Sequence, residues 1–523
     1  MDHIETDVLV IGCGISGATA ALRLAAHPDL RITVITAADD PHVSNTYYAQ
    51  GGIIYTGDDD SPELLSRDIE RAGAGLSNPR AVALVAKEGP PLLHDFLVEK
   101  LQVPFDTIGV KGLERIKEAA HSTARILHVG DYTGQAIQEK LVEALRSCPN
   151  VELVSHHTAV DLLTPSHHSK NRLAVYDPVS CVGAYVFDQA TGKVEAYLAR
   201  KTILATGGLG RIFLHSTNPP GARGDGLAMA YNAGARIINA EYVQFHPTGF
   251  YHRNEVRFLV TEAVRGAGGR LVDEKGQPFM QNYDAQWKDL APRDVVARSI
   301  HRQMLATGTK CVYLDLKSYV PTERILSHFP AIHQKCLEFG VDITKDLIPV
   351  VPAAHYFCGG VWVDDNGRTS IGNLYAVGEV SCTGVHGANR LGSASLLEGM
   401  VWGDRAADDA ARTLAEAELN ASDIPAWRDE GLTDTADPAL IQQDMATIQH
   451  IMWNYVGLVR SARRLDRAIS DLRDLQVDIT RFYGATRLSD GLIGLRNSVQ
   501  AALLIAQAAW ENKVSQGCHY RED

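Results

Sequence analysis

The first apolar stretch of the chain sets the pattern for its N-terminal part. Thr6 to Ile11 (TDVLVI) is an almost uninterrupted apolar run, which is typical of a parallel strand buried on both faces. The glycine-rich segment Gly12 to Gly17 (GCGISG) follows, and Ala18 to Ala26 is rich in Ala and Leu, which favours a helix. The pattern therefore predicts a strand, a tight turn and a helix in that order.

The glycine spacing in this turn predicts a nucleotide-binding site. In a strand–GxGxxG–helix unit the glycines allow a tight turn, close approach to a pyrophosphate and close helix packing. The residues expected to contact the ligand here are Gly12, Gly14, Ile15, Ser16, Gly17 and Ala18. A second strand, Ile32 to Ile35, ends at Thr36, where such units carry an acidic residue for a ribose hydroxyl. Thr36 still offers its own hydroxyl to the ribose.

Two later segments are expected beside these strands. The polar, glycine-rich loop Ser44 to Gly52 follows the second strand on the side where α/β sheets hold ligands, although an ordinary surface loop is an equal alternative. Arg200 to Gly208 is a short apolar strand that ends in small residues, which suggests a return to the same sheet, and Asp225 then lies at the start of a helix.

The pattern changes between Glu241 and His355. Short strands alternate with loops, and Pro292 to Gln303 is predicted to be one amphipathic helix opened by proline. Buried strands return at Gly359 to Val363 and at Asn373 to Gly378, the latter running into Glu379. The middle segment is therefore interpreted as a second domain inserted into the first.

The C-terminal part is predicted to be helical. Beyond about Asn420 the sequence is charged, helical in period and free of turn clusters until Asp490-Gly491. The predicted fold is thus α/β and has three parts: a Rossmann-like nucleotide-binding domain (1–240 and 356–420), an α+β capping domain that interrupts it (241–355) and a helical C-terminal domain (421–523).

Composition and charge restrict the kinds of partner. The 523 residues are 45% hydrophobic and 22% charged, as in a soluble protein of several domains. No run of about 18 apolar residues and no leader pattern appears, so we expect no membrane span and a cytoplasmic location. The net charge of −13, without a Lys/Arg block, argues against nucleic acid as a partner. The eight cysteines are scattered, which favours reduced thiols and no metal site.

The segment Val385 to Val401 (VHGANRLGSASLLEGMV) has the features of an anion-binding site. His386 and Arg390 lie in a loop with two glycines, directly before a predicted helix. A carboxylate can bind to these side chains, and the positive end of the helix favours negative charge.

Several long motifs occur in the order found in one flavoprotein family. They are GCGISG, AQGG, ATGG, QFHPTG, LVTEAVRGAGG, APRDVVARSI, VPAAHYFCGG, VGEV, HGANRLGSASLLEG and the terminal GCHYRED. By these motifs the chain resembles, over essentially its whole length, the flavoprotein family of succinate dehydrogenase, fumarate reductase and L-aspartate oxidase. The resemblance implies FAD as cofactor, an FAD-binding domain interrupted by a capping domain, and redox chemistry on a four-carbon dicarboxylate at their interface.

The resemblance also implies how FAD is held. The membrane-complex members attach FAD covalently through a His before AQGG, and because Asn45 stands there in this chain, we expect non-covalent FAD. The helix start at Ser395 and Leu396 is expected to face the flavin's pyrimidine edge, where it stabilises negative charge. The further FAD contacts implied are Ser44, Asn45, Thr46, Ala49, Gln50, Gly51, Gly52, Thr206, Gly207, Asp225, Glu379, Ser395 and Leu396.

One acidic residue is expected to separate aspartate from succinate as substrate. Aspartate carries an additional ammonium group, and a buried cation needs a partner, so a specific site should supply a carboxylate. Glu118 falls where the aspartate-oxidising members carry Glu in a REGGHS motif, but Ala119 and Ala120 replace the two glycines. A positive φ at either alanine would displace Glu118. A solvated glutamate in a polar loop is the alternative.

The implied reaction is the oxidation of L-aspartate to iminoaspartate, by hydride transfer from the α-carbon to flavin N5 and loss of an amine proton. Dioxygen, giving hydrogen peroxide, or fumarate, giving succinate, accepts the electrons. In this family the product feeds quinolinate synthase in de novo NAD biosynthesis, and a contact with that enzyme is a further expectation.

The resemblance also assigns the residues that bind and protonate the substrate. Those expected around its carboxylates, where a guanidinium fork matches a carboxylate, are Gln244, His246, Thr261, Glu262, His355 and Arg390. Glu118 is expected at the ammonium group, and His386 is expected to be structural. Arg293 corresponds to the family's proton donor to carbon in fumarate reduction. Because a free guanidinium has a pKa above about 12, we expect a relay through Glu262 and Arg265, three residues apart on one helical face.

Two other functions fit part of the pattern. Asn45 and Glu118 argue against a soluble fumarate reductase or succinate dehydrogenase flavoprotein, and comparing L-aspartate with succinate as substrate separates the two. The complete set of candidate residues argues against a catalytically inactive FAD-binding interaction protein. Such a protein would bind FAD but would not be reduced by any dicarboxylate.

Overall fold

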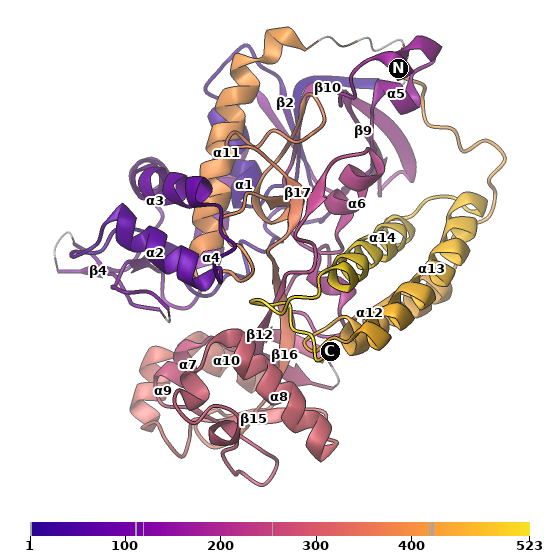
Figure 1. Ribbon diagram of the computed structural model, residues 1–523. Coiled ribbons are helices and arrows are strands. Elements are labelled where there is room, and N and C mark those ends of the chain that lie inside the picture. The colour runs from indigo at the N-terminus through magenta and orange to yellow at the C-terminus, as the bar shows by residue number, and fades with distance from the viewer. Residues whose placement is uncertain (1–2, 110–111, 119, 254, 418, 420–422) are drawn as a thin grey trace.

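The computed structural model describes residues 3–523 except 110–111, 119, 254, 418 and 420–422. Its largest sheet has seven strands and lies in the upper part of the molecule in Figure 1. In spatial order they are β7 (Val151–Val154), β2 (Ile32–Ile35), β1 (His3–Ile11), β10 (Lys193–Leu204), β9 (Gly183–Asp188) and β8 (His157–Leu162), with β18 (Leu374–Ala376) also paired to β10. The first four strands and β18 are parallel, whereas β9 and β8 are antiparallel additions.

The parallel strands end together at one edge of this sheet. Ile11 of β1 pairs with Leu204 of β10 and with Ile35 of β2, and Leu204 in turn pairs with Ala376 of β18. The turns after these four strands are therefore neighbours, although up to several hundred residues of sequence separate them. This edge is where α/β sheets place their ligands.

Two glycines allow the first turn to pack. Gly12 has a φ of +113°, and a Cβ there would lie 2.1 Å from the carbonyl oxygen of Ala205. A Cβ on Gly17 would lie 2.0 Å from the carbonyl oxygen of Gly12. Helix α1 (Ile15–Leu24) can therefore lie close against the strand ends, and α11 (Ala394–Arg412) packs on α1. The turn thus has the geometry that the GxGxxG spacing requires.

A second, antiparallel sheet carries the inserted segment. Its strands in spatial order are β13 (Glu255–Leu259), β12 (Val243–His252), β16 (Ile348–Phe357), β15 (Val312–Asp315) and β14 (Arg270–Val272). The helices of this part, below the main sheet in Figure 1, are α7 (Ala263–Gly266), α8 (Arg293–Thr307), α9 (Thr322–His328) and α10 (Pro330–Glu338). Side chains between Phe250 and Val350 form a separate hydrophobic core, whereas Val243 and Phe357 belong to the main core. Strands β12 and β16 therefore connect the two parts, and the expected boundaries at 240/241 and 355/356 remain predictions.

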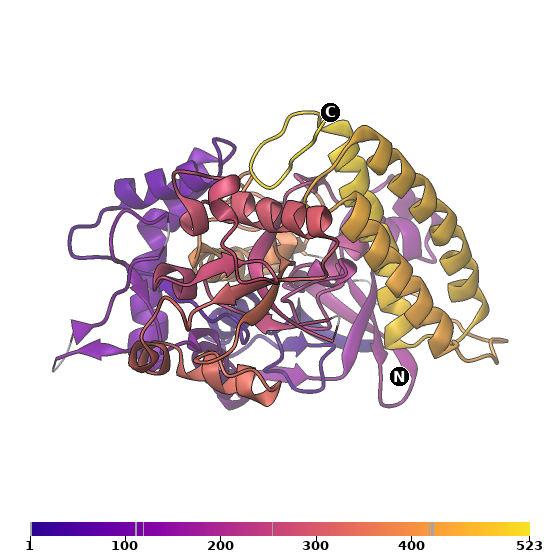
Figure 2. The same cartoon turned by 90° about the horizontal axis from the view of Figure 1, so that it is seen from below.

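Three long helices lie side by side along one flank, shown in yellow tones in Figure 2. They are α12 (Pro438–Tyr455), α13 (Ala462–Ala485) and α14 (Asp490–Glu511). Their buried residues, such as Met452 and Leu495, join the main hydrophobic core. Asp490 and Gly491, which the sequence suggested as a turn, begin α14 because Ser489 caps that helix, its Oγ accepting the N–H of Leu492 at 3.3 Å.

The remaining elements are a small separate sheet, short strand pairs and further helices. The segment expected as a strand at 359–363 forms β17 (Gly360–Trp362), which pairs with β11 (Ile237–Ile238) and β19 (Ser381–Cys382) in a small separate sheet. Two short antiparallel pairs are β3 (Ile53–Ile54) with β6 (Ile126–Leu127) and β4 (Thr107–Ile108) with β5 (Gly112–Leu113). The other helices are α2 (Pro62–Ala72), α3 (Pro79–Leu93), α4 (Thr133–Ser147), α5 (Pro165–His168) and α6 (Asp225–Asn232). Within the described residues, none of the helices combines the length and apolar character that a bilayer crossing requires.

Candidate active site

A cavity of about 1490 Å³ begins at the strand ends of the main sheet and extends to β12 and β16. Most small-molecule sites occupy roughly 300–1,000 Å³, so this one has room for a dinucleotide and a second small molecule. The expected cofactor contacts that line it are Gly12, Gly14, Ile15, Ser16, Thr36, Ser44, Asn45, Thr46, Ala49, Gln50, Gly51, Gly52, Thr206, Gly207, Asp225, Glu379, Ser395 and Leu396. Gly17 and Ala18 do not line it, because they are buried within α1.

The turn after β1 fits the phosphates of a dinucleotide. Helix α1 begins at the cavity wall and has no acidic residue in its first turn, so its positive end is available to an anion. Thr46 Oγ1 accepts the N–H of Ile15 at 3.0 Å, which joins the loop 44–52 to this turn. Thr36 lies directly after β2 on the same wall, where a ribose hydroxyl would be expected.

Two aspartates at helix starts line the cavity near one another. Asp225 accepts Arg223 Nη2 at 2.9 Å on Oδ2 and Asn497 Nδ2 at 3.0 Å on Oδ1. Asp490 pairs with the same arginine at 2.8 Å and accepts Thr158 Oγ1 at 2.7 Å. The sequence did not identify Asp490 as a site residue: Ser-Asp-Gly before helix-forming residues signals a helix start, but only packing brings that start to the cavity.

Glu379 and Asn45 form a half-buried, hydrogen-bonded pair on the cavity wall. Asn45 Nδ2 donates to Glu379 Oε2 at 2.7 Å, and the N–H of Phe357 donates to Oε1 at 2.9 Å. Burial raises the pKa of Glu379 to about 7, although both hydrogen bonds act to lower it. Asn218 Nδ2 donates to Asn45 Oδ1 at 3.1 Å, so both ends of the Asn45 amide are hydrogen-bonded.

The residues expected to bind a dicarboxylate meet at the other end of the cavity. Those that line it are Glu118, His246, Thr261, Glu262, Arg293, His355 and Arg390. The rings of His246 and His355, on neighbouring strands, have centroids 5.4 Å apart. His355 occupies a β-bulge, because Gln244 pairs with Tyr356 and Phe245 with Ala354. A β-bulge beside a functional site changes the direction in which a side chain points.

Both imidazoles at this end are neutral. Burial, followed by the positive charges of Arg293 and Arg390, holds the pKa of His246 and that of His355 well below the ordinary 6.5. His246 Nδ1 accepts the N–H of Thr248 at 3.2 Å, so its proton is assigned to Nε2. A neutral imidazole in this tautomer offers an N–H donor to an anion.

Arg390 is fixed before any anion arrives. Its Nη1 donates to Ser395 Oγ at 2.9 Å, its Nε donates to Gln244 Oε1 at 3.2 Å, and its Cζ lies 4.5 Å from the ring centroid of Tyr356. Among the described residues it forms no ion pair with a carboxylate, and burial lowers the pKa of its guanidinium. Gln244 does not line the cavity, and its observed contact is with Arg390.

The three residues of the expected relay lie in a row. Arg293 Nε donates to Glu262 Oε2 at 2.6 Å, and Arg265 Nη2 lies 3.9 Å from Glu262 Oε1. Burial acts to lower the pKa of Arg293, but the charge and hydrogen bond of Glu262 raise it overall, whereas burial lowers the pKa of Arg265. Arg265 does not line the cavity; its side chain is fully buried and donates to the carbonyl of Asp289.

Glu118 reaches the cavity from the loop before β6. Its Oε2 accepts Ser393 Oγ at 2.7 Å, and a Cβ on Gly392 would lie 3.0 Å from that Oε2 and 3.3 Å from Arg293 Nη2. Glu118 and Arg293 therefore lie close to each other beside Gly392. Ala120 has a φ of +67°, a conformation that costs an alanine about 1–2 kcal/mol. Ala119 is outside the described residues. The left-handed conformation at Ala120 thus does not remove Glu118 from the cavity.

His386 does not line the cavity, in agreement with the structural role expected for it. Its Nε2 lies 2.9 Å from Glu398 Oε2, which also accepts the hydroxyl of Tyr356 at 3.1 Å. All three side chains are buried. This cluster supports Tyr356, whose ring lies against Arg390. The sequence did not single out Glu398 or Tyr356, because neither has a local signal beyond its motif.

Comparisons with known proteins agree with this geometry. The family model "FAD binding domain" matches residues 7–396, and "Fumarate reductase flavoprotein C-term" matches residues 445–523. L-Aspartate oxidase of Yersinia pestis is 42% identical over 527 residues, covering 100% of this chain and 96% of the relative, and that of Halobacterium salinarum is 43% identical over 522 residues, covering 100% and 97%. Solved E. coli quinol fumarate reductase has a TM-score of 0.89 at 27% identity, covering 100% of this chain and 92% of that chain. The chain therefore belongs to the FAD-dependent flavoprotein family that includes L-aspartate oxidase and the flavoproteins of fumarate reductase and succinate dehydrogenase.

Proposed function

We propose that this chain catalyses the FAD-dependent oxidation of L-aspartate to iminoaspartate, with dioxygen or fumarate as electron acceptor. The observation that carries the proposal is one end of the cavity, where the guanidinium groups of Arg293 and Arg390, two neutral imidazoles and the carboxylate of Glu118 face the same space. L-Aspartate has two carboxylates and one ammonium group, which match these charges. Full-length relatives named L-aspartate oxidase support the assignment.

The other end of the cavity fits FAD. The glycine turn after β1, the open start of α1 and the hydroxyl of Thr36 suit a pyrophosphate and a ribose. When bound, FAD supplies the hydride acceptor at flavin N5 and passes the electrons to the second substrate. The side chain of Asn45 cannot form the bond that a histidine forms to flavin, so FAD is held non-covalently. Acid precipitation of the purified protein should therefore release the flavin into the supernatant.

Arg390 and the two histidines bind the substrate carboxylates. Arg390 is held by Gln244 and Ser395, so its remaining donors meet a carboxylate without reorganisation. His246 contributes its Nε2–H, and its neutrality leaves the positive charge of this wall to the arginines. Glu118 then pairs with the ammonium group, which succinate and fumarate lack.

Arg293 and Glu262 carry out proton transfer at the substrate. The raised pKa of Arg293 keeps it charged beside a carboxylate. In fumarate reduction, a proton given by Arg293 to carbon is replaced through Glu262, whose carboxylate lies between the two arginines. Arg265, with its lowered pKa, is the better donor to that carboxylate.

The proposed domains place the dicarboxylate between two of them. The FAD-binding domain comprises 1–240 and 356–420, the capping domain 241–355 and the helical domain 421–523, so the dicarboxylate lies where the FAD-binding and capping domains meet. The reaction is placed in the cytoplasm as the first step of de novo NAD biosynthesis. Iminoaspartate is unstable in water, which favours rapid use by quinolinate synthase.

The deciding experiment is anaerobic addition of L-aspartate to the purified protein. We expect the visible absorbance of the flavin to bleach, and succinate to bleach it far less. Bleaching by succinate alone would favour a fumarate reductase or succinate dehydrogenase flavoprotein. Bound FAD that no dicarboxylate bleaches would favour an inactive FAD-binding protein.

A variant links the activity to the ammonium group. Glu118→Gln keeps the shape of the side chain but removes its charge. We expect the KM for L-aspartate to rise by about tenfold or more, equivalent to about 1.4 kcal/mol or more of lost binding. The KM for fumarate should change little, and an equal rise for both substrates would contradict the role given to Glu118.

A further inference from the structure

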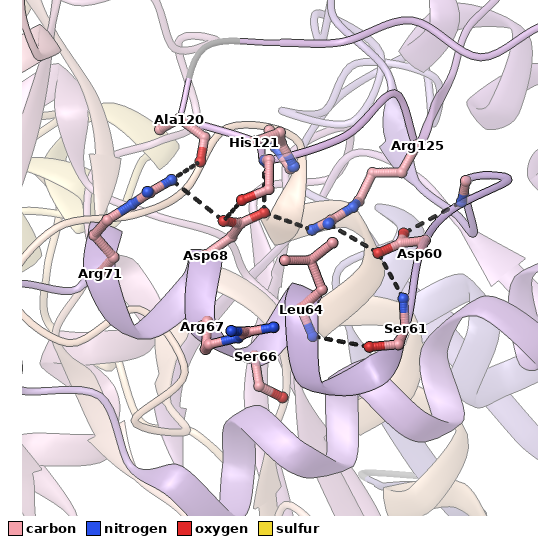
Figure 3. A network of polar contacts seen from close by, with 12 residues as sticks. Asp60, Ser61, Leu64, Ser66, Arg67, Asp68, Arg71, Ala120, His121 and Arg125 are labelled. Atoms are coloured by element: carbon pink, nitrogen blue, oxygen red, sulfur yellow. Dashed lines mark hydrogen bonds and ion pairs between the residues drawn. The ribbon is translucent and has the colours of Figure 1, made fainter.

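A buried network on α2 holds the loop that carries Glu118 (Figure 3). At its centre is Asp68, whose side chain is 2% exposed. Asp68 Oδ2 accepts the N–H of Ser122 at 2.8 Å, and Oδ1 accepts the hydroxyl of the same serine at 2.5 Å. A single carboxylate thus fixes both the backbone and the side chain of one loop residue, four positions after Glu118.

The same carboxylate partners a fully buried cation. The side chain of Arg125 is 0% exposed; its Nη1 lies 3.0 Å from Asp68 Oδ2 and its Nη2 donates to Asp60 Oδ1 at 2.9 Å. Arg125 comes directly before β6, where the loop ends. Because a buried charge depends on its partners, Asp60, Asp68 and Arg125 form a support beneath the loop.

Arg71, one turn after Asp68 on α2, reaches the loop beside Glu118. Its Nη2 lies 3.2 Å from Asp68 Oδ1 and donates to the carbonyl oxygen of Ala120 at 2.8 Å (Figure 3). Ala120 has a φ of +67°, which glycine adopts freely and alanine does not. The chain has alanine where the REGGHS motif has glycine, so the hydrogen bond from Arg71 offsets a strain that is specific to this sequence.

The loop is also held from its other side. His121 Nε2 lies 3.1 Å from the carbonyl oxygen of Gly392, and Glu118 Oε2 accepts Ser393 Oγ at 2.7 Å. Gly392 and Ser393 directly precede α11. The position of the Glu118 carboxylate is therefore set by α2 beneath the loop and by the start of α11 beside it.

We propose that Asp68 is a positioning residue for recognition of the substrate's ammonium group. Through Ser122, and with Arg71 through Ala120, it keeps Glu118 at the cavity wall. Asp68 does not line the cavity and acts only through Glu118. The inference rests on the proposed function, because it requires Glu118 to bind that ammonium group.

The test compares Asp68→Asn with the wild-type, FAD-loaded full chain. L-Aspartate oxidation and the reduction of fumarate by reduced benzyl viologen are measured separately. We expect the KM for L-aspartate to rise about tenfold, with kcat and the KM for fumarate within about twofold of wild type. Arg67→Met is the matched control: Arg67 is exposed on the same helix and, among the described residues, donates to the carbonyl of Glu63 alone, so both KM values should stay unchanged.

Two milder variants keep the ion pair between Asp68 and Arg125. Ser122→Ala removes one hydrogen bond to Asp68, and Arg71→Met removes the one to Ala120. Each should raise the KM for L-aspartate about threefold and leave that for fumarate unchanged. Ala120→Gly in the Arg71→Met background should restore the KM for L-aspartate, because glycine adopts this φ without strain. A purely structural weakening would not be repaired by that change.

The outcomes separate the inference from the function on which it rests. A rise in KM of equal size for L-aspartate and fumarate in Asp68→Asn and Arg71→Met overturns the positioning role. Wild-type values for L-aspartate in both variants overturn it as well. A wild-type protein that does not oxidise L-aspartate overturns the proposed function instead, and that result comes before any variant is made.

Discussion

At the scale of single residues, burial sets the charge states of the site. His246 and His355 are neutral because they are buried beside arginines, and Arg390 is a buried cation that forms no ion pair with a described carboxylate. A cation held in this way binds an anion strongly, because burial has already removed the water that would otherwise compete for the guanidinium. The charge states of this cavity wall are therefore set before a carboxylate binds, and the carboxylate does not have to induce them.

Arg293→Leu tests the proton donor. We expect fumarate reduction to fall by at least about a hundredfold, because no other donor replaces the guanidinium, while FAD stays bound. Steady-state rates and the flavin absorbance of the purified variant check this. Arg302→Leu, the same change on an exposed face of α8, should leave the rate near wild type. A normal rate in Arg293→Leu would rule out its role.

Glu379→Gln tests the raised pKa of that carboxyl group. Its folded pKa of about 7 lies above the ordinary value of 4.5, so its stabilising contribution is full below about pH 4.5 and is lost as pH rises through about 7. Relative to the variant, the free energy of unfolding of the wild type should therefore fall by up to about 3 kcal/mol as the pH rises from about 4.5 to about 7. Thermal unfolding of both proteins at pH 5 and pH 8 measures the difference in stability between wild type and variant. A difference in stability that is the same at both pH values would contradict the raised pKa of Glu379.

Motif membership predicted which residues gather at the cavity better than it predicted their individual contacts. Arg390 and His246 line the wall, but Gln244, in the same motif as His246, contacts Arg390 instead. Arg265 is likewise buried behind Glu262. These differences depend on where each side chain points, and that direction comes from packing between β12, β16 and the Arg390 loop.

At the scale of elements, glycine and capping residues decide where helices begin and end. The helix expected at 292–303 is α8, which continues to Thr307 because Gly308 then takes a φ of +68° and ends it. Similarly, Ser489 makes Asp490-Gly491 the start of a helix instead of a turn. The hydrophobic pattern predicted these helices, whereas a single backbone conformation set their ends.

Gly308→Ala isolates this backbone effect. A Cβ at Gly308 meets nothing within 4 Å, so the substitution adds strain without a clash. We expect a loss of about 1 kcal/mol of stability and unchanged kinetics. Gly484→Ala is the control: nothing lies within 4 Å of a Cβ there either, but the residue lies in the last turn of α13 and its φ is not positive. That variant should be stabilised by about 0.5–1 kcal/mol, as thermal unfolding can show. Equal effects would contradict the explanation.

At the scale of the whole molecule, the C-terminal segment joins parts that are distant in sequence. The N–H of Cys518 donates to the carbonyl of Ala388, beside the Arg390 loop, at 2.9 Å. The ring of Tyr520 lies 4.8 Å from the guanidinium of Arg298 on α8. The segment therefore links the loop that holds Arg390 to the helix that begins with Arg293.

Removal of residues 516–523 tests this link. We expect the temperature of thermal unfolding to fall by about 5 °C, because buried Arg460 loses its contact with His519. The KM values for L-aspartate and fumarate should both rise, since Arg390 and Arg293 bind carboxylates of either substrate. Tyr520→Phe, which keeps the ring, should behave like wild type. Unchanged KM values in the truncated protein would show that the link does not support the site.

The sequence by itself determined the family, the fold class and the nucleotide-binding turn, because these depend on local spacing: an apolar strand, three glycines and a helix, and long motifs in a fixed order. The tertiary structure decided which side chains meet. Glu118 bonds to Ser393 across 275 residues, and Asp68 supports Glu118 from a helix without a recognised motif. Contacts of this kind arise from the packing of α2, β12 and α11 around one cavity, and no local pattern encodes that packing.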